Sequence, residues 1–190
     1  MFPLDLEKLT ADERAMVNLW ERHLQAEFQA KDACASCDTM VERPYVNHVP
    51  VLTGGVGRQQ LEHFYARYFI PSLPPDVELV PISRTVGQNR LVDEFIFRCT
   101  HTVEIPWLLP GVAPTGRRLE LVKVVIVTFA DGKIKNEHIH WDQASALVQV
   151  GLLDPTSLPV VGAEAARKML DPESVPSNLL IKRTIVDDLL

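Results

Sequence analysis

The stretch that decides the fold is "RRLELVKVVIVTFADGKIKNEHIHWD", residues 117–142. It holds two runs rich in apolar and β-branched residues, which are joined by Ala130, Asp131 and Gly132. An Asp-Gly pair between two such runs is a strong signal for a hairpin turn. The sequence therefore predicts two long antiparallel strands, over residues 117–129 and 133–141.

A second hairpin is predicted upstream. The runs "VELVPISRTV" (residues 77–86) and "RLVDEFIFRCTHTVEI" (residues 90–105) are separated by the turn residues Gly87, Gln88 and Asn89. Between the two hairpins lies "PWLLPGVAPTG", residues 106–116, a proline-rich loop that could close over the mouth of a pocket. Consecutive hairpins predict a curved antiparallel sheet.

The residues before the sheet have helical periodicity. In "TADERAMVNLWERHLQAEFQA", residues 10–30, Thr10 and Glu13 fit a capping box. One face of this helix is apolar apart from one histidine, and it comprises Met16, Leu19, Trp20, His23, Leu24 and Phe28. Helices are also expected over residues 31–42, 58–70, 143–150 and 163–170. Residues 45–52 read as a strand or extended loop, which Pro50 keeps from a central place in the sheet, and "TGGVG" (53–57) reads as a turn.

Composition excludes several classes of protein. The 190 residues carry a formal net charge of −6, whereas a nucleic-acid-binding protein needs a concentrated basic face. No apolar run approaches the ~20 residues of a membrane span. The three cysteines are an odd number, and no apolar stretch opens the chain, so we expect a cytoplasmic protein. We interpret Cys34 and Cys37 as inert thiols, because a zinc or redox site would need further residues that the sequence does not show.

The order of elements, helices first and sheet second, is typical of an α+β fold with helices covering one sheet face. Alternation places Asn136, His138, His140 and Asp142 on one face of the last strand. It places Ile139 and Trp141 on the other face. Alternation alone does not say which of the two faces the helices cover.

Two segments carry a resemblance to a known family: "THTVEIPWLLPGVAPTGRRLE" (100–120) and "DGKIKNEHIHWDQASALVQVGLL" (131–153). A Thr-His pair, a loop ending Pro-Thr-Gly-Arg, Asp-Gly-Lys-Ile, an aspartate at a strand end and Gln-x-Gly-Leu follow in this order. The chain thereby resembles the SnoaL-like polyketide cyclase branch of the nuclear transport factor 2-like superfamily, over residues 10–153. We expect a single domain over residues 1–190, in which residues 154–190 extend the core.

The resemblance implies a cone-shaped curved sheet, of the cystatin-like kind, whose N-terminal helices enclose a pocket. It also implies dimers across the outer sheet face, to which the outward-facing Trp141 would contribute. In such cyclases an aspartate at the end of the last strand is the acid/base, which points to Asp142, with His140 and His138 beside it in the pocket. The residues expected to contact the substrate are His101, Trp107, Asn47, Tyr65, Phe69 and Thr128.

Two alternatives for these residues stay open. Asp142 directly precedes a predicted helix, where an aspartate is a favoured N-cap, and the backbone N–H bonds of a cap lower a carboxyl pKa. His138 and His140 could instead hold iron or zinc with His101 or Glu104 as a third ligand.

The sequence thus leads to three hypotheses. The first is an enzyme without cofactor or metal, a cyclase, isomerase or related hydrolase, that performs acid/base chemistry on a hydrophobic carbonyl or enol compound. The second is a non-catalytic ligand-binding or dimerisation module, and the third is the metal site. The expected partners are a small hydrophobic ligand and a second copy of the chain, with no nucleic acid and no membrane.

Overall fold

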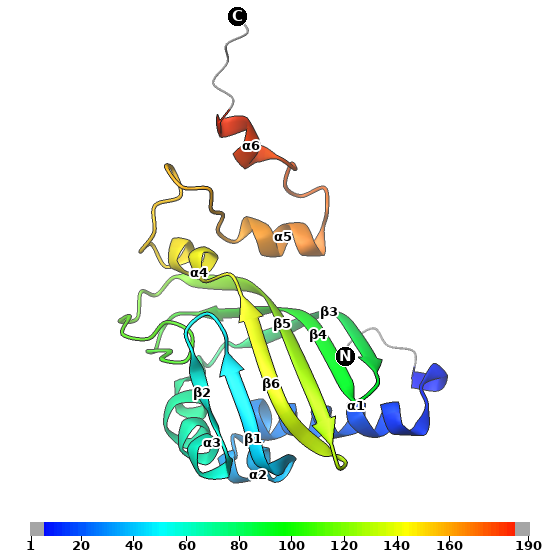
Figure 1. The fold of residues 1–190 in the computed structure, drawn as a ribbon. Coiled ribbons are helices and arrows are strands. Elements are labelled where there is room, and N and C mark those ends of the chain that lie inside the picture. Colours follow the sequence, from blue (N-terminus) through cyan, green and yellow to red (C-terminus); the bar gives the residue numbers. More distant parts are fainter. Residues whose placement is uncertain (1–5, 185–190) are drawn as a thin grey trace, which may run out of the picture.

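A computed structural model describes residues 6–184 of the chain (Figure 1). One curved sheet dominates it, with the strand order β2-β1-β6-β5-β4-β3. The strands are β1 (Met40–His48), β2 (Thr53–Val56), β3 (Glu78–Gly87), β4 (Arg90–Thr100), β5 (Arg118–Ala130) and β6 (Lys133–Trp141). The mixed α+β fold with N-terminal helices against one curved sheet is the predicted one.

Both predicted hairpins are confirmed. β3 pairs antiparallel with β4, and β5 pairs antiparallel with β6. The turns place Asn89, Asp131 and Gly132 at positive φ, which asparagine, aspartate and glycine tolerate best. The sheet is not wholly antiparallel, because β1 lies parallel to β6. Register shifts place one extra residue in β3 and one in β6, and such bulges bend a sheet locally.

Helices precede, interrupt and follow the sheet. In chain order they are η1 (Leu6–Lys8), α1 (Ala11–Leu24), η2 (Gln25–Ala30), α2 (Ala33–Asp38), α3 (Arg58–Phe64), η3 (Tyr65–Phe69), η4 (Ile70–Ser72), α4 (Gln143–Gln149), α5 (Glu164–Leu170) and α6 (Leu179–Thr184). The capping box of Thr10 and Glu13 at the start of α1 is confirmed. In Figure 1, α1, α2 and α3 lie against the sheet, while α5 and α6 lie beyond the end at which β6 finishes.

Two of these helical segments are π-helical. η2 continues α1, and η3 continues α3. π-Turns widen a helix locally, are rare, and occur often at functional sites. Here they carry Glu27, Tyr65 and Phe69 to the concave side of the sheet.

The segment between α2 and α3 differs from the prediction. The helix expected over residues 31–42 ends at Asp38, and β1 starts at Met40 and runs through Pro44. The register between β1 and β6 shifts between Met40 and Tyr45, so that Pro44 interrupts no ladder bond to β6. The predicted turn 53–57 is strand β2. At Gly54 a Cβ would lie 2.1 Å from the Val46 carbonyl oxygen, and only glycine permits this close approach.

The core fills the concave side of the sheet. The loop between β4 and β5 takes part in it, because Ile105, Trp107, Leu108 and Leu109 are fully buried. Thr53 donates a hydrogen bond to the Trp107 carbonyl (3.0 Å), and Gln143 donates one to the Leu108 carbonyl (3.1 Å). These bonds hold the proline-rich loop over the concave face. Within residues 6–184, no helix is both long enough and apolar enough to cross a membrane.

Candidate functional site

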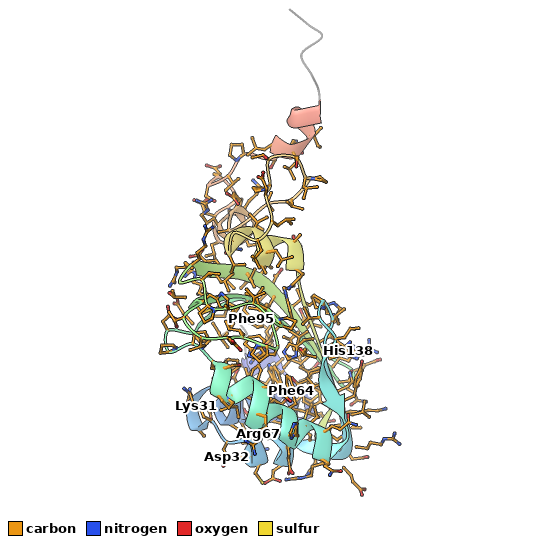
Figure 2. All side chains as sticks on the ribbon, turned by 90° about the vertical axis from the view of Figure 1, so that its left-hand side faces the viewer. Lys31, Asp32, Phe64, Arg67, Phe95 and His138 are labelled. Carbon is orange, nitrogen blue, oxygen red and sulfur yellow. The ribbon has the colours of Figure 1, made fainter. Side chains whose placement is uncertain are left out.

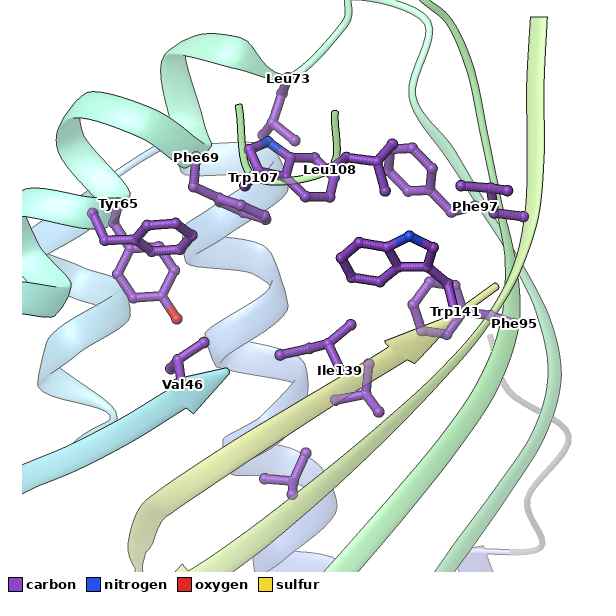
Figure 3. Packing of buried hydrophobic residues seen from close by; sticks show 14 of the residues in the cluster. Val46, Tyr65, Phe69, Leu73, Phe95, Phe97, Trp107, Leu108, Ile139 and Trp141 are labelled. Carbon is purple, nitrogen blue, oxygen red and sulfur yellow. The ribbon is translucent and has the colours of Figure 1, made fainter. Parts of the chain in front are cut away.

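A cavity of about 60 Å³ lies between the concave face and the helices. Its volume gives room for roughly four water molecules. Most of its wall is apolar or aromatic: Trp20, Leu24, Phe28, Val46, Phe69, Leu79, Phe95, Phe97, Trp107, Val125 and Ile139. The remaining lining residues are titratable: Glu27, His48, Tyr65, Asp93, Lys123 and Glu137. Figure 3 shows the aromatic side chains converging from η3, β4, β6 and the loop.

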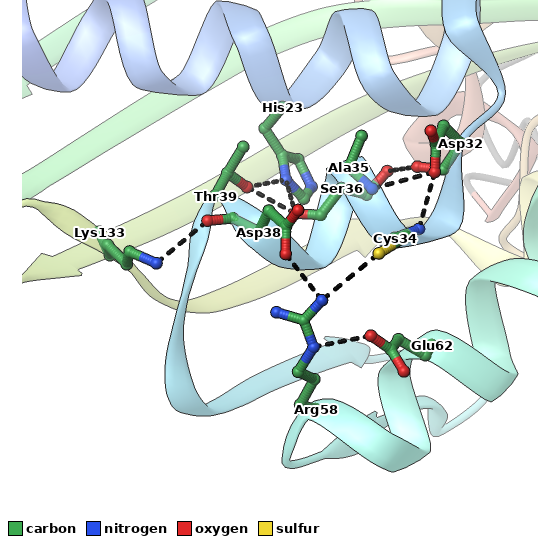
Figure 4. A network of polar contacts seen from close by, with 10 residues as sticks. All are labelled: His23, Asp32, Cys34, Ala35, Ser36, Asp38, Thr39, Arg58, Glu62 and Lys133. Carbon is green, nitrogen blue, oxygen red and sulfur yellow. Dashed lines mark hydrogen bonds and ion pairs between the residues drawn. The ribbon is translucent and has the colours of Figure 1, made fainter.

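One end of the cavity is a buried histidine between two glutamates. The His23 ring comes from α1, and its Nδ1 lies 2.7 Å from the Thr39 hydroxyl, which itself donates to the Ser36 carbonyl at 2.6 Å (Figure 4). Because the single hydroxyl proton of Thr39 is used in that bond, Nδ1 must carry the proton and donate. The other ring nitrogen, Nε2, then faces the carboxylates.

His23 Nε2 lies 3.0 Å from Glu27 Oε1 and 3.2 Å from Glu137 Oε1. The Tyr65 hydroxyl is 3.4 Å away. Burial alone would lower the pKa of His23, but the charges of Glu137 and Glu27 outweigh burial and raise this pKa to about 10. His23 is therefore an imidazolium ion at neutral pH.

Glu137 brings a carboxyl from β6 into this cluster. Burial raises the pKa of Glu137, an effect that His23 opposes. Its Oε1 is within ion-pair distance of Nε2, yet among the described residues no hydrogen bond of good geometry reaches that atom. Glu137 also lines the cavity, so that a bound molecule would meet a carboxyl whose proton affinity is increased.

A second acid in the wall, Asp93, is fully engaged. Arg84 binds it through two hydrogen bonds of 2.5 and 2.6 Å, and Trp20 Nε1 donates to it at 2.7 Å. Arg84 also pairs with Glu21. Such a bidentate pair fixes β3, β4 and α1 relative to one another. Both oxygens of Asp93 are occupied, so this carboxylate is a structural group.

The opposite end of the cavity is an aromatic box that contains Lys123. The His48 ring packs against Trp107 and Trp141, with ring centroids 5.5 and 5.8 Å away. Its Nδ1 donates to the Thr53 carbonyl at 3.3 Å, which leaves the Nε2 lone pair available. Burial, assisted by the charge of Lys123, lowers the pKa of His48 to about 3, so the ring is neutral.

The predicted inward orientation of His138, His140 and Asp142 is wrong. His138 packs against Tyr45 on the outer face, with ring centroids 5.6 Å apart, and Figure 2 shows it at the edge of the molecule, away from Phe95. His140 and Asp142 are exposed and border a shallow hollow outside the cavity. Asp142 accepts a hydrogen bond of 2.9 Å from the Ala144 N–H and caps α4.

Alternation grouped these residues correctly, but the two faces were exchanged. Glu137, Ile139 and Trp141 are buried on the concave side. Trp141, predicted to face outward, contacts His48 and Lys123 inside. The catalytic role assigned to the outer three residues rested on the exchanged faces and stays a prediction without a contact to this cavity.

Of the six residues predicted to contact a substrate, three line the cavity and three do not. Tyr65, Phe69 and Trp107 line the cavity, although their contact with a substrate stays a prediction. Asn47 alternates with the buried Val46 and His48 and therefore points to the outer face. Thr128 is also on the outer face, where Asn136 donates to it at 3.3 Å.

His101 is buried behind the cavity and is not part of its lining. Its Nδ1 lies 3.1 Å from the Thr115 hydroxyl, a contact that joins the two ends of the loop between β4 and β5. Glu104 is exposed. The metal set that combined these residues with His138 and His140 does not assemble. Among the described residues, the group of donors close enough for a metal ion is instead His23, Glu27 and Glu137.

Five titratable lining residues of the cavity were not among the predicted site residues: Glu27, His48, Asp93, Lys123 and Glu137. His23, which lies between Glu27 and Glu137, was missed as well. A signal for His23 was available, because His23 and Glu27 are four residues apart and therefore share one face of α1 and its π-helical continuation. Lys123 also stands alone within the alternating apolar series of β5, the pattern of a charge that faces the core.

Comparison with known proteins agrees with this fold. The family described as SnoaL-like polyketide cyclase matches residues 16–150, and the chain belongs to this family. No curated protein matches the sequence.

Three solved structures illustrate the similarity. A protein from Jannaschia sp. CCS1 assigned as a SnoaL-like polyketide cyclase is 18% identical, with a TM-score of 0.61 over 77% of this chain and 99% of that chain. TsrD from Streptomyces laurentii is 18% identical, with a TM-score of 0.59 over 77% of this chain and 100% of its own. AclR from Streptomyces galilaeus, assigned as a hydroxylase, is 19% identical, with a TM-score of 0.56 over 75% and 99%. At these identities the likeness concerns the fold alone.

Proposed function

We propose that the chain is a small-molecule enzyme that performs acid/base chemistry, without a cofactor, on a hydrophobic carbonyl or enol compound. Glu137 is the proton-transfer group and His23 is its charged partner. The observation that carries this proposal is the buried Glu27–His23–Glu137 cluster, whose two glutamates line a mostly apolar and aromatic cavity. The family membership and the similar structures assigned as a cyclase and a hydroxylase agree with an enzyme.

In the proposed reaction, Glu137 takes a proton from a carbon next to a carbonyl group and returns it to the same or a neighbouring atom. A carboxyl with a raised pKa suits both steps, because its carboxylate is a stronger base than an ordinary one and its acid form can return the proton. The neighbouring imidazolium of His23 stabilises Glu137 as the anion when the proton is away.

The enolate oxygen formed in this step needs a hydrogen-bond donor. The Tyr65 hydroxyl lines the cavity beside His23, and burial raises the pKa of Tyr65 well above its ordinary value. Tyr65 therefore stays protonated and can donate. Trp107, predicted to contact the substrate, has an Nε1 without a hydrogen-bond partner among the described residues and is a further candidate.

The test is an exchange experiment with cyclopentanone as a small apolar ketone. The wild-type protein in D₂O is expected to accelerate deuterium incorporation next to the carbonyl, measured by NMR. Glu137→Gln keeps the size of the side chain but cannot take the proton, and it should slow exchange about 10²- to 10⁴-fold. Equal exchange by a folded Glu137→Gln protein would contradict the proposal.

The same experiment distinguishes the alternatives. Asp142→Ser keeps an N-cap oxygen and removes the carboxylate, so a loss of exchange in this variant would restore Asp142 as the acid/base. Binding of cyclopentanone without any exchange in the wild type would indicate the non-catalytic binding module.

A second candidate is a metal site at the same cluster, because His23, Glu27 and Glu137 place three donor atoms within 4.8 Å of one another. Titration of the metal-free protein with Zn²⁺ or Mn²⁺ in a calorimeter tests it. Metal binding by the wild type that disappears in Glu137→Gln would favour the metal site. If the wild type binds neither ion, the acid/base function remains the proposal.

We also propose that the protein is cytoplasmic and that two copies of it form a homodimer across the outer sheet face. The half-buried Val122, Val124 and Ile126 form an apolar strip on that face, but Trp141, predicted to join it, lies inside. Val124→Lys should then dissociate the dimer in sedimentation experiments. A wild-type protein that sediments as a monomer at micromolar concentration would contradict the dimer.

A further inference from the structure

Lys123 is the unusual residue of the cavity. It lies on β5 among apolar residues of the concave face and is 3% exposed. Its ammonium nitrogen stands over three aromatic rings, at 4.3 Å from the ring centre of Phe97, 4.4 Å from Trp107 and 4.7 Å from Trp141. Figure 3 shows these three rings, which come from β4, the loop and β6, around one space.

Among the described residues, 6–184, this amine has no anionic partner. No carboxylate or hydrogen-bond acceptor there contacts Nζ, whereas the buried Arg84 binds Asp93 directly and the buried His23 lies between two glutamates. A buried lysine without a partner is rare, because the charged form loses its hydration. The faces of aromatic rings attract the ammonium and offset part of its lost hydration energy, but they do not accept hydrogen bonds as water does.

The surroundings favour the neutral amine. Burial lowers the pKa of Lys123 to about 7. Cys99 on β4 and Glu27 on η2 act in the opposite direction and are outweighed. His48 on β1 is neutral, since burial lowers its pKa to about 3. At neutral pH Lys123 is therefore present in part as the neutral, nucleophilic amine, whereas an exposed lysine is almost wholly protonated.

We propose that Lys123 is a nucleophilic amine that forms a Schiff base with an aldehyde or ketone bound in the cavity. The amine nitrogen attacks the carbonyl carbon, a C–N bond forms, and the carbonyl oxygen takes up a proton. The resulting carbinolamine then loses one molecule of water to give the C=N bond, and hydrolysis reverses the sequence. Neither an oxidant nor a reductant is needed.

His48 lies beside Lys123 and can hold the reacting groups in place. Two of the rings around Lys123, those of Trp107 and Trp141, also pack against His48. With Nδ1 donating to the Thr53 carbonyl, the Nε2 lone pair can accept a hydrogen bond from the amine or from the carbinolamine hydroxyl, while the proton passes from the attacking nitrogen to the carbonyl oxygen. The inference deepens the proposed function, because it assigns the substrate class of the same cavity to aldehydes and ketones.

The test is reductive trapping with propanal and sodium cyanoborohydride at pH 7, followed by peptide mass spectrometry. Propyl addition is expected at Lys123 at least tenfold faster than at the exposed Lys135 of the same molecule. The Lys123 rate should level off above pH 7, whereas an ordinary exposed lysine gains reactivity up to about pH 10. Lys123→Met should remove this fast fraction and leave the surface lysines unchanged.

An unmodified Lys123, or one that reacts with the pH dependence of Lys135, would overturn the inference. Trapping in Glu137→Gln separates it from the proposed function. Adduct formation at Lys123 in that variant would support the Schiff-base role of Lys123, even where deuterium exchange of the ketone is lost. Deuterium exchange by the wild type without any adduct at Lys123 would refute the nucleophilic role of the amine and leave the proposed function standing.

Discussion

The two ends of the cavity each bury a base, and their proton affinities move in opposite directions. His23 is fully buried and its pKa rises to about 10, while Lys123 is fully buried and its pKa falls to about 7. Burial acts on both in the same sense, since it disfavours the charged form. Only His23 has carboxylates within 3.2 Å, and Lys123 has ring faces instead.

The difference shows that the partner, and not the depth of burial, decides which base keeps its proton. The two proposed roles are therefore compatible within one cavity. The charge of His23 would stabilise the Glu137 anion at one end, and Lys123 would offer a lone pair at the other.

The largest effect is expected when the cation is removed from the acidic end. His23→Gln leaves two buried carboxylates without a positive charge, which should lower the free energy of unfolding by about 3–5 kcal/mol. Urea denaturation at pH 7 measures it.

The matched control adds Glu27→Gln to the same protein. One carboxyl then remains, which can take up a proton, so part of the lost stability should return. A double variant that is less stable than His23→Gln would show that the carboxylates do not repel each other as described.

Removing the other base should have the opposite sign. Lys123→Met replaces an unpartnered ammonium with an apolar chain of similar length, and at pH 6 it should raise the free energy of unfolding by about 3 kcal/mol. The gain should shrink as pH rises from 7 towards 10.5, because the folded wild type then holds the neutral amine. A Lys123→Met protein that is less stable than the wild type at pH 6 would contradict a Lys123 ammonium without an anionic partner.

The pH dependence of stability tests the opposite pKa shifts of His23 and Lys123 directly. Between pH 7 and pH 10 folding takes up a proton at His23 and releases one at Lys123, so in the wild type the two slopes largely cancel. Lys123→Met should show stability that falls with pH, and His23→Gln should show stability that rises, each by up to about 1.4 kcal/mol per pH unit. Parallel curves for the two variants would refute opposite shifts.

The smallest effect is expected outside the cavity. Asp142→Ala removes the cap of α4 and should cost about 1 kcal/mol, whereas Asp142→Ser should change stability by only a few tenths. Thermal unfolding of the two variants side by side measures the cap. A larger loss in Asp142→Ser would mean that the carboxylate makes a contribution beyond its hydrogen bond to Ala144.

Much of the fold was predictable because local signals agreed with it. The Asp-Gly turn, the capping box at Thr10 and the helical spacing of aromatic residues each depend on neighbouring residues alone. The β1 segment was not predictable in the same way. Its pairing with β6 joins residues far apart in the chain, and its proline suggested a break where the structure has a bulge.

The site was predicted less well for a physical reason. Alternation fixes which residues share a face, but the helices decide which face is inside. On β5 both faces carry valines, so the sequence gives little contrast between them. The polar series of His138, His140 and Asp142 then looked functional, and the local preference of aspartate for a helix start proved to describe Asp142 better.

One chain of hydrogen bonds couples the loop above the cavity to the amine inside it. Gln143 donates to the Leu108 carbonyl and accepts from Trp141 Nε1 at 2.6 Å, so the loop and one ring of the aromatic box share a single side chain. Lifting the loop would admit water to Lys123 and return its pKa towards 10.5. At pH values between these limits the open molecule binds a proton that the closed molecule releases. Opening of the loop would thus be coupled to proton uptake, and base added to the medium would favour the closed form.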